Sequence, residues 1–86
     1  MAKLRILYFA WLRERVGHAE EELALPEGIA TLGDLIAWLR TRHAGYAAAF
    51  AEPGLVRAAV NQEFARPEAA IADGDEVAFF PPITGG

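Results

Sequence analysis

The amino-acid sequence predicts an α+β domain in which one main helix packs across a mixed β-sheet. The first observation is the alternation of charged and apolar residues from Lys3 to Tyr8, which is typical of a half-buried strand. The second is the helical spacing of apolar residues that follows Thr31. The third is the order of the elements, with two strands before the main helix and three after it. A sheet covered on one side only keeps its other face open.

The first predicted strand, over residues 3–9, has two unlike faces. Its core face carries the apolar members of the alternation, which are Leu4, Ile6 and Tyr8. Lys3 and Arg5 mark the opposite face as the solvent face. Leu7 and Phe9 fall on that same solvent face, so the second half of the strand is apolar on both sides.

Two short elements follow the first strand. Residues 10–16 suit a short helix, and Gly17 is placed to end it because glycine readily adopts the left-handed conformation of a helix C-terminus. Residues 20–25 then read as a second strand, in which Leu23 and Leu25 share one face.

The main helix is predicted to begin at Thr31, because Thr31 and Asp34 have the spacing of a capping box. Its apolar stripe consists of Leu32, Leu35, Ile36 and Leu39. We expect Gly45 to stop this helix, with His43 near its C-terminal end. Residues 46–51 suit another helical turn.

The C-terminal half predicts three further strands. Residues 55–60 read as a strand, residues 61–63 turn the chain, and a short segment surrounds Phe64. An Asp-Gly-Asp turn at residues 73–75 delivers the last strand, over residues 76–80. We therefore expect a folded domain over residues 1–80 and an extended tail over residues 81–86.

Strand parity also predicts an apolar patch on the open face of the sheet. If Val77 faces the helix, Phe80 faces away from it and joins Leu7 and Phe9, and Phe64 extends the same patch. An exposed apolar patch is typical of a protein–protein interface. The alternative is that a loop covers these side chains.

The tail has the sequence Pro81-Pro82-Ile83-Thr84-Gly85-Gly86. The prolines favour extended backbone, and six residues reach on the order of 20 Å. Gly86 has no Cβ, so its carboxylate suits a narrow active site. The apolar run before the prolines favours this interpretation over a frayed end, which is more often polar.

Composition limits the class of partner. The 86 residues carry a net charge of −4 with only eight Lys and Arg residues, which argues against nucleic acid. No cysteine is present, so thiolate metal sites and cysteine nucleophiles are excluded. No segment has the length of a membrane span or the pattern of a signal peptide, so we expect a cytoplasmic protein with no membrane partner.

The sequence shows no other candidate site. His18 and His43 lack ligand spacing, so we expect no metal site. Serine is absent, which excludes a Ser-His-Asp triad, and no glycine pattern forms a phosphate loop. The carboxylates of residues 20–22, with Asp73, Asp75 and Glu76, are interpreted as solvated faces, and the alternative is that they steer a basic partner.

With these features the chain resembles a known family, the small, sulfur-carrying subunits of molybdopterin synthase, within the ubiquitin-like β-grasp group. The resemblance spans the chain and is most specific in residues 73–86, from Asp-Gly-Asp to the terminal Gly-Gly. The segments Tyr8-Phe9-Ala10 and Ala59-Val60-Asn61-Gln62 support it.

The resemblance implies a cycle of chemistry at Gly86, in a heterotetrameric synthase whose small subunit lacks a complete active site. A ubiquitin-activating-like enzyme uses ATP to adenylate the Gly86 carboxylate, and a sulfur donor displaces AMP to give a thiocarboxylate. Residues 81–85 then insert into the large subunit, where the sulfur passes to cyclic pyranopterin monophosphate to form molybdopterin. AMP and sulfur are transient, and no permanently bound cofactor is expected.

Two other functions stay open at this point. The chain could carry sulfur for thiamin, thiolated tRNA or cysteine synthesis, or act as a ubiquitin-like protein modifier, with the same activated Gly86. It could also be a plain interaction module whose glycine tail is incidental.

Overall fold

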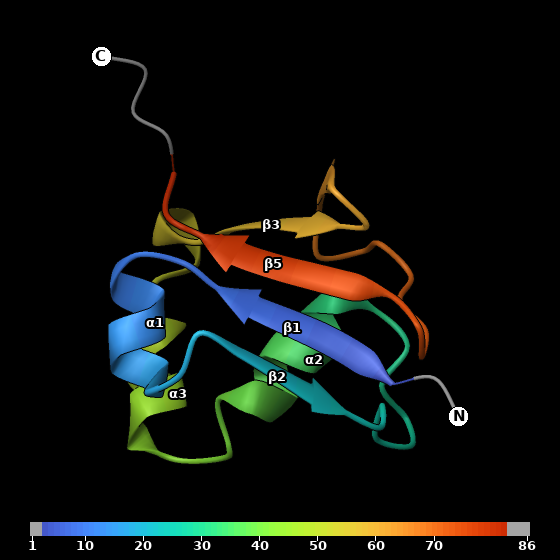
Figure 1. Ribbon diagram of the computed structural model, residues 1–86, viewed down its shortest axis with the longest axis horizontal. Coiled ribbons are helices and arrows are strands. Elements are labelled where there is room, and N and C mark those ends of the chain that lie inside the picture. Colours follow the sequence, from blue (N-terminus) through green and yellow to red (C-terminus); the bar gives the residue numbers. More distant parts are fainter. Residues whose placement is uncertain (1–2, 83–86) are drawn as a thin grey trace.

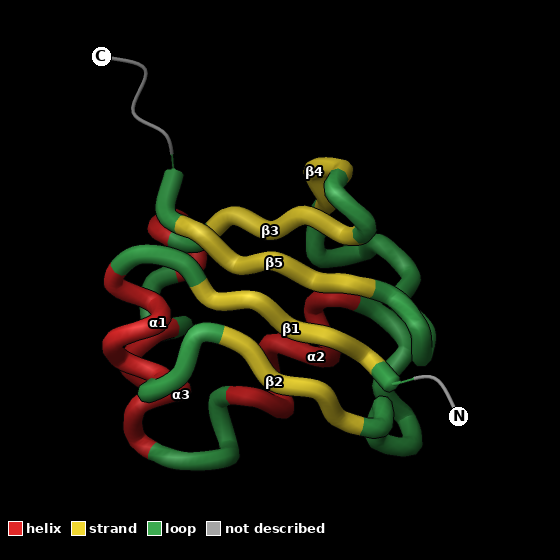
Figure 2. Tube along the Cα trace, viewed as in Figure 1, coloured by secondary structure: helices red, strands yellow, loops and turns green. Residues whose placement is uncertain are grey.

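The computed structural model describes residues 3–82, which form a five-stranded sheet with helices on one face (Figures 1 and 2). The strands are β1 (Leu4–Tyr8), β2 (Glu20–Leu23), β3 (Arg57–Val60), β4 (Glu63–Ala65) and β5 (Glu76–Phe80). The helices are α1 (Trp11–Val16), α2 (Leu32–Leu39), α3 (Ala44–Ala49) and the 3₁₀ helix η1 (Pro53–Leu55). The predicted order of strands and main helix is confirmed.

The sheet has the strand order β2-β1-β5-β3-β4. β1 and β5 pair in parallel, whereas the other neighbours are antiparallel, so the predicted mixed sheet is confirmed. The two arrows point the same way in Figure 1, and the Phe9 N–H donates to the Phe79 carbonyl at 3.0 Å. The chain therefore leaves β1 and β5 at the same end of the sheet.

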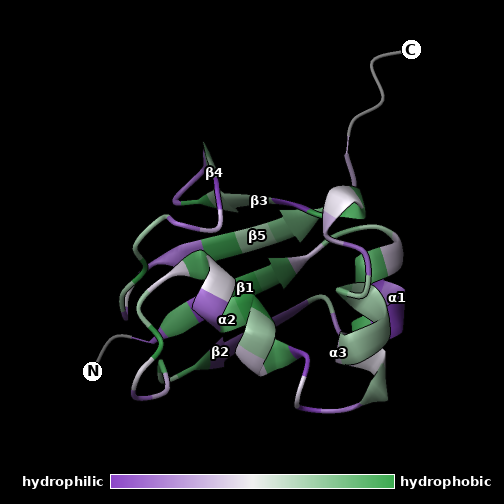
Figure 3. Cartoon of the chain, turned by 180° about the vertical axis from the view of Figure 1, so that it is seen from behind, coloured by the Kyte–Doolittle hydropathy of each residue, from purple (hydrophilic) through white to green (hydrophobic). Residues whose placement is uncertain are grey.

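The core lies between the helices and the inner face of the sheet. Seen from behind in Figure 3, α2 lies across that face and apolar residues line the strands beneath it. On β1, Leu4 and Ile6 are fully buried and Tyr8 is 2% exposed. Val77 and Phe79 supply the inner face of β5, and both are fully buried. The face assignments made from strand parity are thus confirmed for β1 and β5.

Two predicted helix ends are confirmed. Thr31 Oγ1 accepts from the Asp34 N–H at 3.1 Å, and Asp34 Oδ2 accepts from the Thr31 N–H at 3.2 Å, which completes the capping box of α2. Gly17 ends α1 with a φ of 102°, and its N–H donates to the Arg13 carbonyl. The left-handed conformation explains why glycine stands there.

The predicted stop of the main helix at Gly45 is wrong. α2 already ends at Leu39, after which the Thr41 hydroxyl donates to the Trp38 carbonyl at 2.6 Å. Gly45 instead lies inside α3, where a Cβ would clash with the carbonyl oxygen of Arg15. His43 likewise does not end α2 but caps α3, because its Nδ1 accepts from the Gly45 N–H at 2.9 Å.

The remaining segments differ from the predictions at their ends. The second strand stops at Leu23 rather than residue 25, and the third begins at Arg57 because η1 occupies Pro53–Leu55. Asn61 and Gln62, with φ of 52° and 71°, form the two-residue turn between β3 and β4. The predicted short segment around Phe64 is β4.

Candidate functional site

The start of the tail follows directly from the centre of the sheet. Pro81 and Pro82 come after the last residue of β5 and are half-buried. Ile83, Thr84, Gly85 and Gly86 lie outside the described residues. The roles predicted for residues 81–86 stay predictions.

The four apolar residues predicted for the open face do lie on one face. The register places Leu7 beside Ala78, Ala78 beside Ala59, and Ala59 beside Phe64, in one row across β1, β5, β3 and β4. In Figure 1 no helix stands in front of β1 and β5 on this side. We call the side chains of Leu7, Phe9, Phe64 and Phe80 the apolar patch.

The patch is open to solvent over much of its area. Phe9 is 49% exposed and Phe64 is 80% exposed, so no loop of the described residues covers these two rings. Leu7 and Phe80 are half-buried, and neither belongs to the core. A contiguous exposed apolar patch is typical of a surface that binds a protein. The interface role of the patch stays a prediction.

The patch is hollowed near the start of the tail. The rings of Phe64 and Phe80 lie 5.9 Å apart, centre to centre, and are tilted by 55°. Together with Arg57, Ala58 and Ala65 they line a shallow hollow of about 370 Å³. Such a depression suits one apolar side chain of a partner.

Charged residues border the patch on the β2 side. Arg5 pairs with Glu20 at 3.0 Å on the open face, and both side chains are about half exposed. Glu22 lies opposite Arg5 across the β1–β2 pair. A polar rim beside an apolar centre is the usual arrangement of a protein-binding surface.

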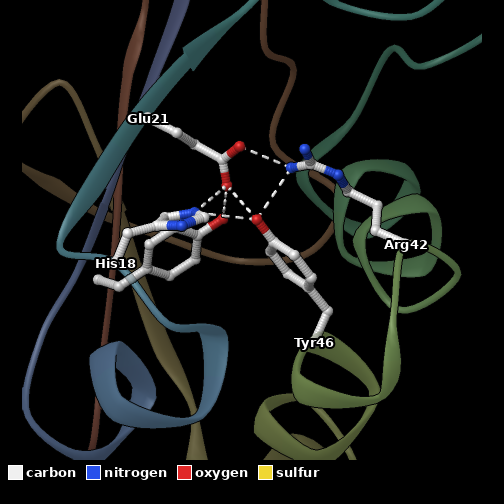
Figure 4. A network of polar contacts seen from close by, with 5 residues as sticks. His18, Glu21, Arg42 and Tyr46 are labelled. Atoms are coloured by element: carbon white, nitrogen blue, oxygen red, sulfur yellow. Dashed lines mark hydrogen bonds and ion pairs between the residues drawn. The ribbon is translucent and has the colours of Figure 1, made fainter.

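A second cluster of side chains surrounds Glu21 on the other face of the sheet (Figure 4). Oε2 of Glu21 accepts hydrogen bonds from the hydroxyls of Tyr8 at 2.8 Å and Tyr46 at 2.6 Å, and it lies 3.1 Å from Nε2 of His18. Oε1 accepts from the Arg42 guanidinium at 2.6 Å. We call these five residues the Glu21 network; it joins β1, β2, α3 and the chain before α3.

The network changes the acidity of its members. Burial of the Glu21 carboxylate opposes its ionisation, but hydrogen bonds from Arg42 and the two tyrosines outweigh burial and lower the pKa of Glu21 to about 2. Burial and the adjacent carboxylate raise the pKa of Tyr46 to about 12. The same causes raise the pKa of Tyr8 far above its ordinary value. Glu21 is therefore an anion and both tyrosines are neutral donors at physiological pH.

The sequence-based interpretation of Glu21 as a solvated residue is wrong. Its side chain is only 14% exposed, whereas Glu20 and Glu22 are exposed as predicted. Glu21 has the same strand parity as Leu23, and this signal places it on the helix side. Its partners Arg42 and Tyr46, 21 and 25 residues away, could not be paired with it from the sequence.

Both histidines make contacts within the domain. His18 contacts Glu21 and Tyr46, and His43 caps α3. Within residues 3–82 no group of three or more His, Cys, Asp or Glu side chains is arranged to hold a metal ion. In the same part of the chain, no helix has the length and apolar character needed to cross a membrane.

Comparison with known proteins gives consistent matches over nearly the whole chain. Residues 6–86 match the ThiS family. The molybdopterin synthase sulfur carrier subunit of Escherichia coli (strain K12) is 40% identical over 83 residues, which cover 96% of this chain and 99% of that protein.

Two solved structures are also similar. One, from Pyrococcus furiosus and described as a candidate molybdopterin converting factor subunit 1, has a TM-score of 0.77 at 34% identity, covering 96% of this chain and all of the other. Small archaeal modifier protein 1 of Haloferax volcanii has a TM-score of 0.76 at 31% identity, with the same coverage.

Proposed function

Because the chain belongs to the ThiS family, we propose that it is the sulfur carrier subunit of a molybdopterin synthase. Its fold is the ubiquitin-like β-grasp of its structural neighbours. The relative named for this function covers 96% of the chain at 40% identity. A small subunit of this kind implies a large-subunit partner.

One observation carries the proposal. The apolar patch lies on the open face of the same sheet from which the tail departs, and Phe80 belongs to the patch and immediately precedes Pro81. A large subunit docked on Leu7, Phe9, Phe64 and Phe80 therefore has the start of the tail at its surface. The patch supplies binding energy, while the tail is left to deliver Gly86 into the partner's active site.

The chemistry proposed for Gly86 follows from the stability of its carboxylate. An α-carboxyl group has a pKa of about 3.3–3.7, so at neutral pH it is an anion that resists nucleophilic attack. An oxygen of this carboxylate attacks the α-phosphate of ATP and releases pyrophosphate, which leaves an acyl adenylate. Sulfide supplied by a sulfur donor then attacks the carbonyl carbon and AMP leaves, giving the thiocarboxylate. The activating enzyme supplies the nucleotide site.

In the synthase, the thiocarboxylate sulfur bonds to a carbon of cyclic pyranopterin monophosphate as a carbon–oxygen bond of that carbon breaks, and the oxygen leaves with the phosphate or as water. Hydrolysis of the resulting thioester leaves the sulfur on the pterin and returns the Gly86 carboxylate. The dithiolene of molybdopterin contains two sulfur atoms, so each product uses two chains that carry a thiocarboxylate at Gly86. In this scheme residues 81–85 serve as a spacer that fits a narrow channel, and Gly86 is the reacting residue. Residues that handle the pterin belong to the large subunit.

The decisive experiment is reconstitution. The chain is prepared with a C-terminal thiocarboxylate and mixed with an active large subunit and cyclic pyranopterin monophosphate, and we expect molybdopterin to form. The carboxylate form and a chain lacking Gly86 should give none. Product from the chain lacking Gly86 would contradict the proposal.

A second function is favoured by one comparison. The similar Haloferax volcanii protein is named a small archaeal modifier protein. A modifier would pass its activated Gly86 to a lysine amine instead of a sulfur donor. Covalent adducts on target lysines in cells, together with failure of the reconstitution, would support that function or sulfur transfer in another pathway.

A further inference from the structure

A larger hollow lies on the helix side of the sheet, apart from the apolar patch. It has a volume of about 500 Å³ and lies between α2, η1, β3 and the chain after β4. Its floor is apolar and firm, because Leu32, Phe50 and Ala58 belong to the core and Phe50 packs edge-on against Phe79 with ring centres 4.9 Å apart. Half-buried Ile36 and Val56 form its walls.

The rim of this hollow is basic. It carries Arg40, Arg57 and Arg66, three of the eight Lys and Arg residues of a chain whose net charge is −4. None of the three forms an ion pair within residues 3–82, whereas Arg5 and Arg42 both do. Among the described residues, no carboxylate lines the hollow. Three exposed guanidinium groups around an apolar floor complement a ligand that is both acidic and apolar.

The spacing of the arginines favours an extended ligand over a single compact anion. Arg66 adjoins the first turn of α2, because the Gly33 N–H donates to the carbonyl of Pro67 at 2.8 Å. Arg40 caps the other end of α2. Gly33 and Arg40 lie seven positions apart along the helix, which at 1.5 Å per residue is about 10 Å. An extended peptide covers this distance in about three residues.

The hollow also continues towards the apolar patch. Arg57, Ala58 and Ala65 line both this hollow and the shallow one beside Phe64 and Phe80. The two hollows therefore adjoin at the β3–β4 edge of the sheet, so a protein docked on the patch is within reach of the larger one.

We propose that this hollow is a second docking site, which binds an extended segment of a protein partner with two carboxylates flanking apolar side chains. The carboxylates lie against Arg40 and Arg66, and the apolar side chains enter between Ile36 and Val56. The inference does not depend on sulfur chemistry at Gly86, so it and the proposed function can fail separately.

The test is an NMR titration of the ¹⁵N-labelled full chain with the peptide acetyl-Glu-Leu-Val-Glu-amide. We expect the amide signals of Ile36, Val56 and Ala65 to shift. Peptides with Gln for Glu, or with Gly-Gly for Leu-Val, should bind about tenfold more weakly, because each lacks one half of the complementarity. Raising the salt concentration to about 1 M should weaken binding of the acidic peptide.

Paired variants identify the site. Arg40→Glu with Arg66→Glu should weaken binding of the acidic peptide about tenfold or more, while Lys3→Glu with Arg13→Glu, which changes the net charge equally far from the hollow, should not. All four side chains are exposed, so the variants should remain folded. The proposal is overturned if the peptide does not bind, if both double variants bind alike, or if inorganic phosphate produces the same shifts with equal affinity. Concentration-dependent shifts of these signals without peptide would identify a second copy of the chain as the occupant and also overturn it.

Discussion

The hydroxyl of Tyr46 donates a hydrogen bond of 2.6 Å to Oε2 of Glu21, and this contact joins α3 to the edge strand β2. Tyr46 is 1% exposed, so loss of the carboxylate would remove the shortest hydrogen bond of a buried hydroxyl, whose other contacts to His18 and Arg42 are both 3.0 Å long. Arg42 holds the other carboxylate oxygen. The Glu21 network therefore fixes the packing of α3, which is only six residues long and too short to be stable alone.

Replacing Glu21 with glutamine should lower the free energy of unfolding by about 1–3 kcal/mol. The amide has one acceptor oxygen where the carboxylate has two, and its NH₂ group would face donors. Urea denaturation measures the effect. Glu22→Gln is the matched control, because Glu22 is exposed on the same strand, and should change stability by less than about 0.5 kcal/mol. Equal effects of the two variants would show that the network contributes no stability.

The network also predicts how stability depends on pH. The pKa of Glu21 falls from its ordinary value of 4.5 to about 2 on folding, so the unfolded chain binds more protons between these values. The stabilisation is fully present above about pH 5 and is lost as the pH falls towards 2. Asp34, whose pKa is lowered by the backbone N–H groups of Ala30 and Thr31, acts in the same direction.

The Glu21→Gln variant removes the contribution of Glu21 to the pH dependence of stability and retains that of Asp34. It therefore separates the two contributions. Urea midpoints measured at neutral pH and at about pH 3 should therefore converge for the variant and the unmodified chain as the pH falls. A difference between them that is constant with pH would contradict the assignment of the lowered pKa to Glu21.

Local patterns in the sequence predicted much of this structure. Thr31 and Asp34 lie three residues apart, so their capping box could be predicted, and strand parity placed Leu7 and Phe80 on the open face. Contacts between distant segments could not be predicted in this way. The partners of Glu21 were missed because Arg42 and Tyr46 are far away in sequence, and Gly45 was misinterpreted because its role depends on the nearby Arg15 carbonyl.

The contact between α1 and α3 makes Gly45 hard to replace. A Cβ there would clash with the Arg15 carbonyl oxygen and lie 2.7 Å from Cε1 of His43, which is held as the cap of α3. Gly45→Ala should lower the free energy of unfolding by about 1–3 kcal/mol, because backbone must move. In contrast, a Cβ at Gly54 would meet no atom within 4 Å, so Gly54→Ala should be neutral or slightly stabilising. Thermal melts of both variants measure the difference. Equal melting temperatures for both variants would refute the close approach of α1 and α3.

Ala10 adopts backbone angles that suit glycine. Its φ is 56° and its ψ is −134°, where an alanine Cβ is strained. Ala10→Gly should therefore raise the free energy of unfolding by up to about 1 kcal/mol, measured in urea. Ala48→Gly, in α3, should instead lower it by about 1 kcal/mol, since glycine disfavours helix. Destabilisation by Ala10→Gly would mean that the strain is smaller than the entropy lost by glycine.

Phe80 offers the sharpest test of the apolar patch, because it stands next to the buried Phe79 on one strand but on the opposite face. Phe80→Asp places a charge where the proposed large subunit would exclude water. We therefore expect the free energy of binding to the large subunit to weaken by about 2 kcal/mol or more. The cost to folding should be smaller, because Phe80 is only half-buried and the new carboxylate can reach solvent.

Calorimetric titration with the large subunit and urea denaturation measure the two effects on the same preparations. Ala37→Asp adds the same charge on the exposed side of α2 and should leave the affinity unchanged. Phe64→Asp further distinguishes a role in binding from a role in folding. Its side chain is 80% exposed, so its effect on folding should be small. If Phe80→Asp costs as much stability as affinity while Phe64→Asp costs neither, the aromatic pair supports the fold instead, and the large subunit docks elsewhere.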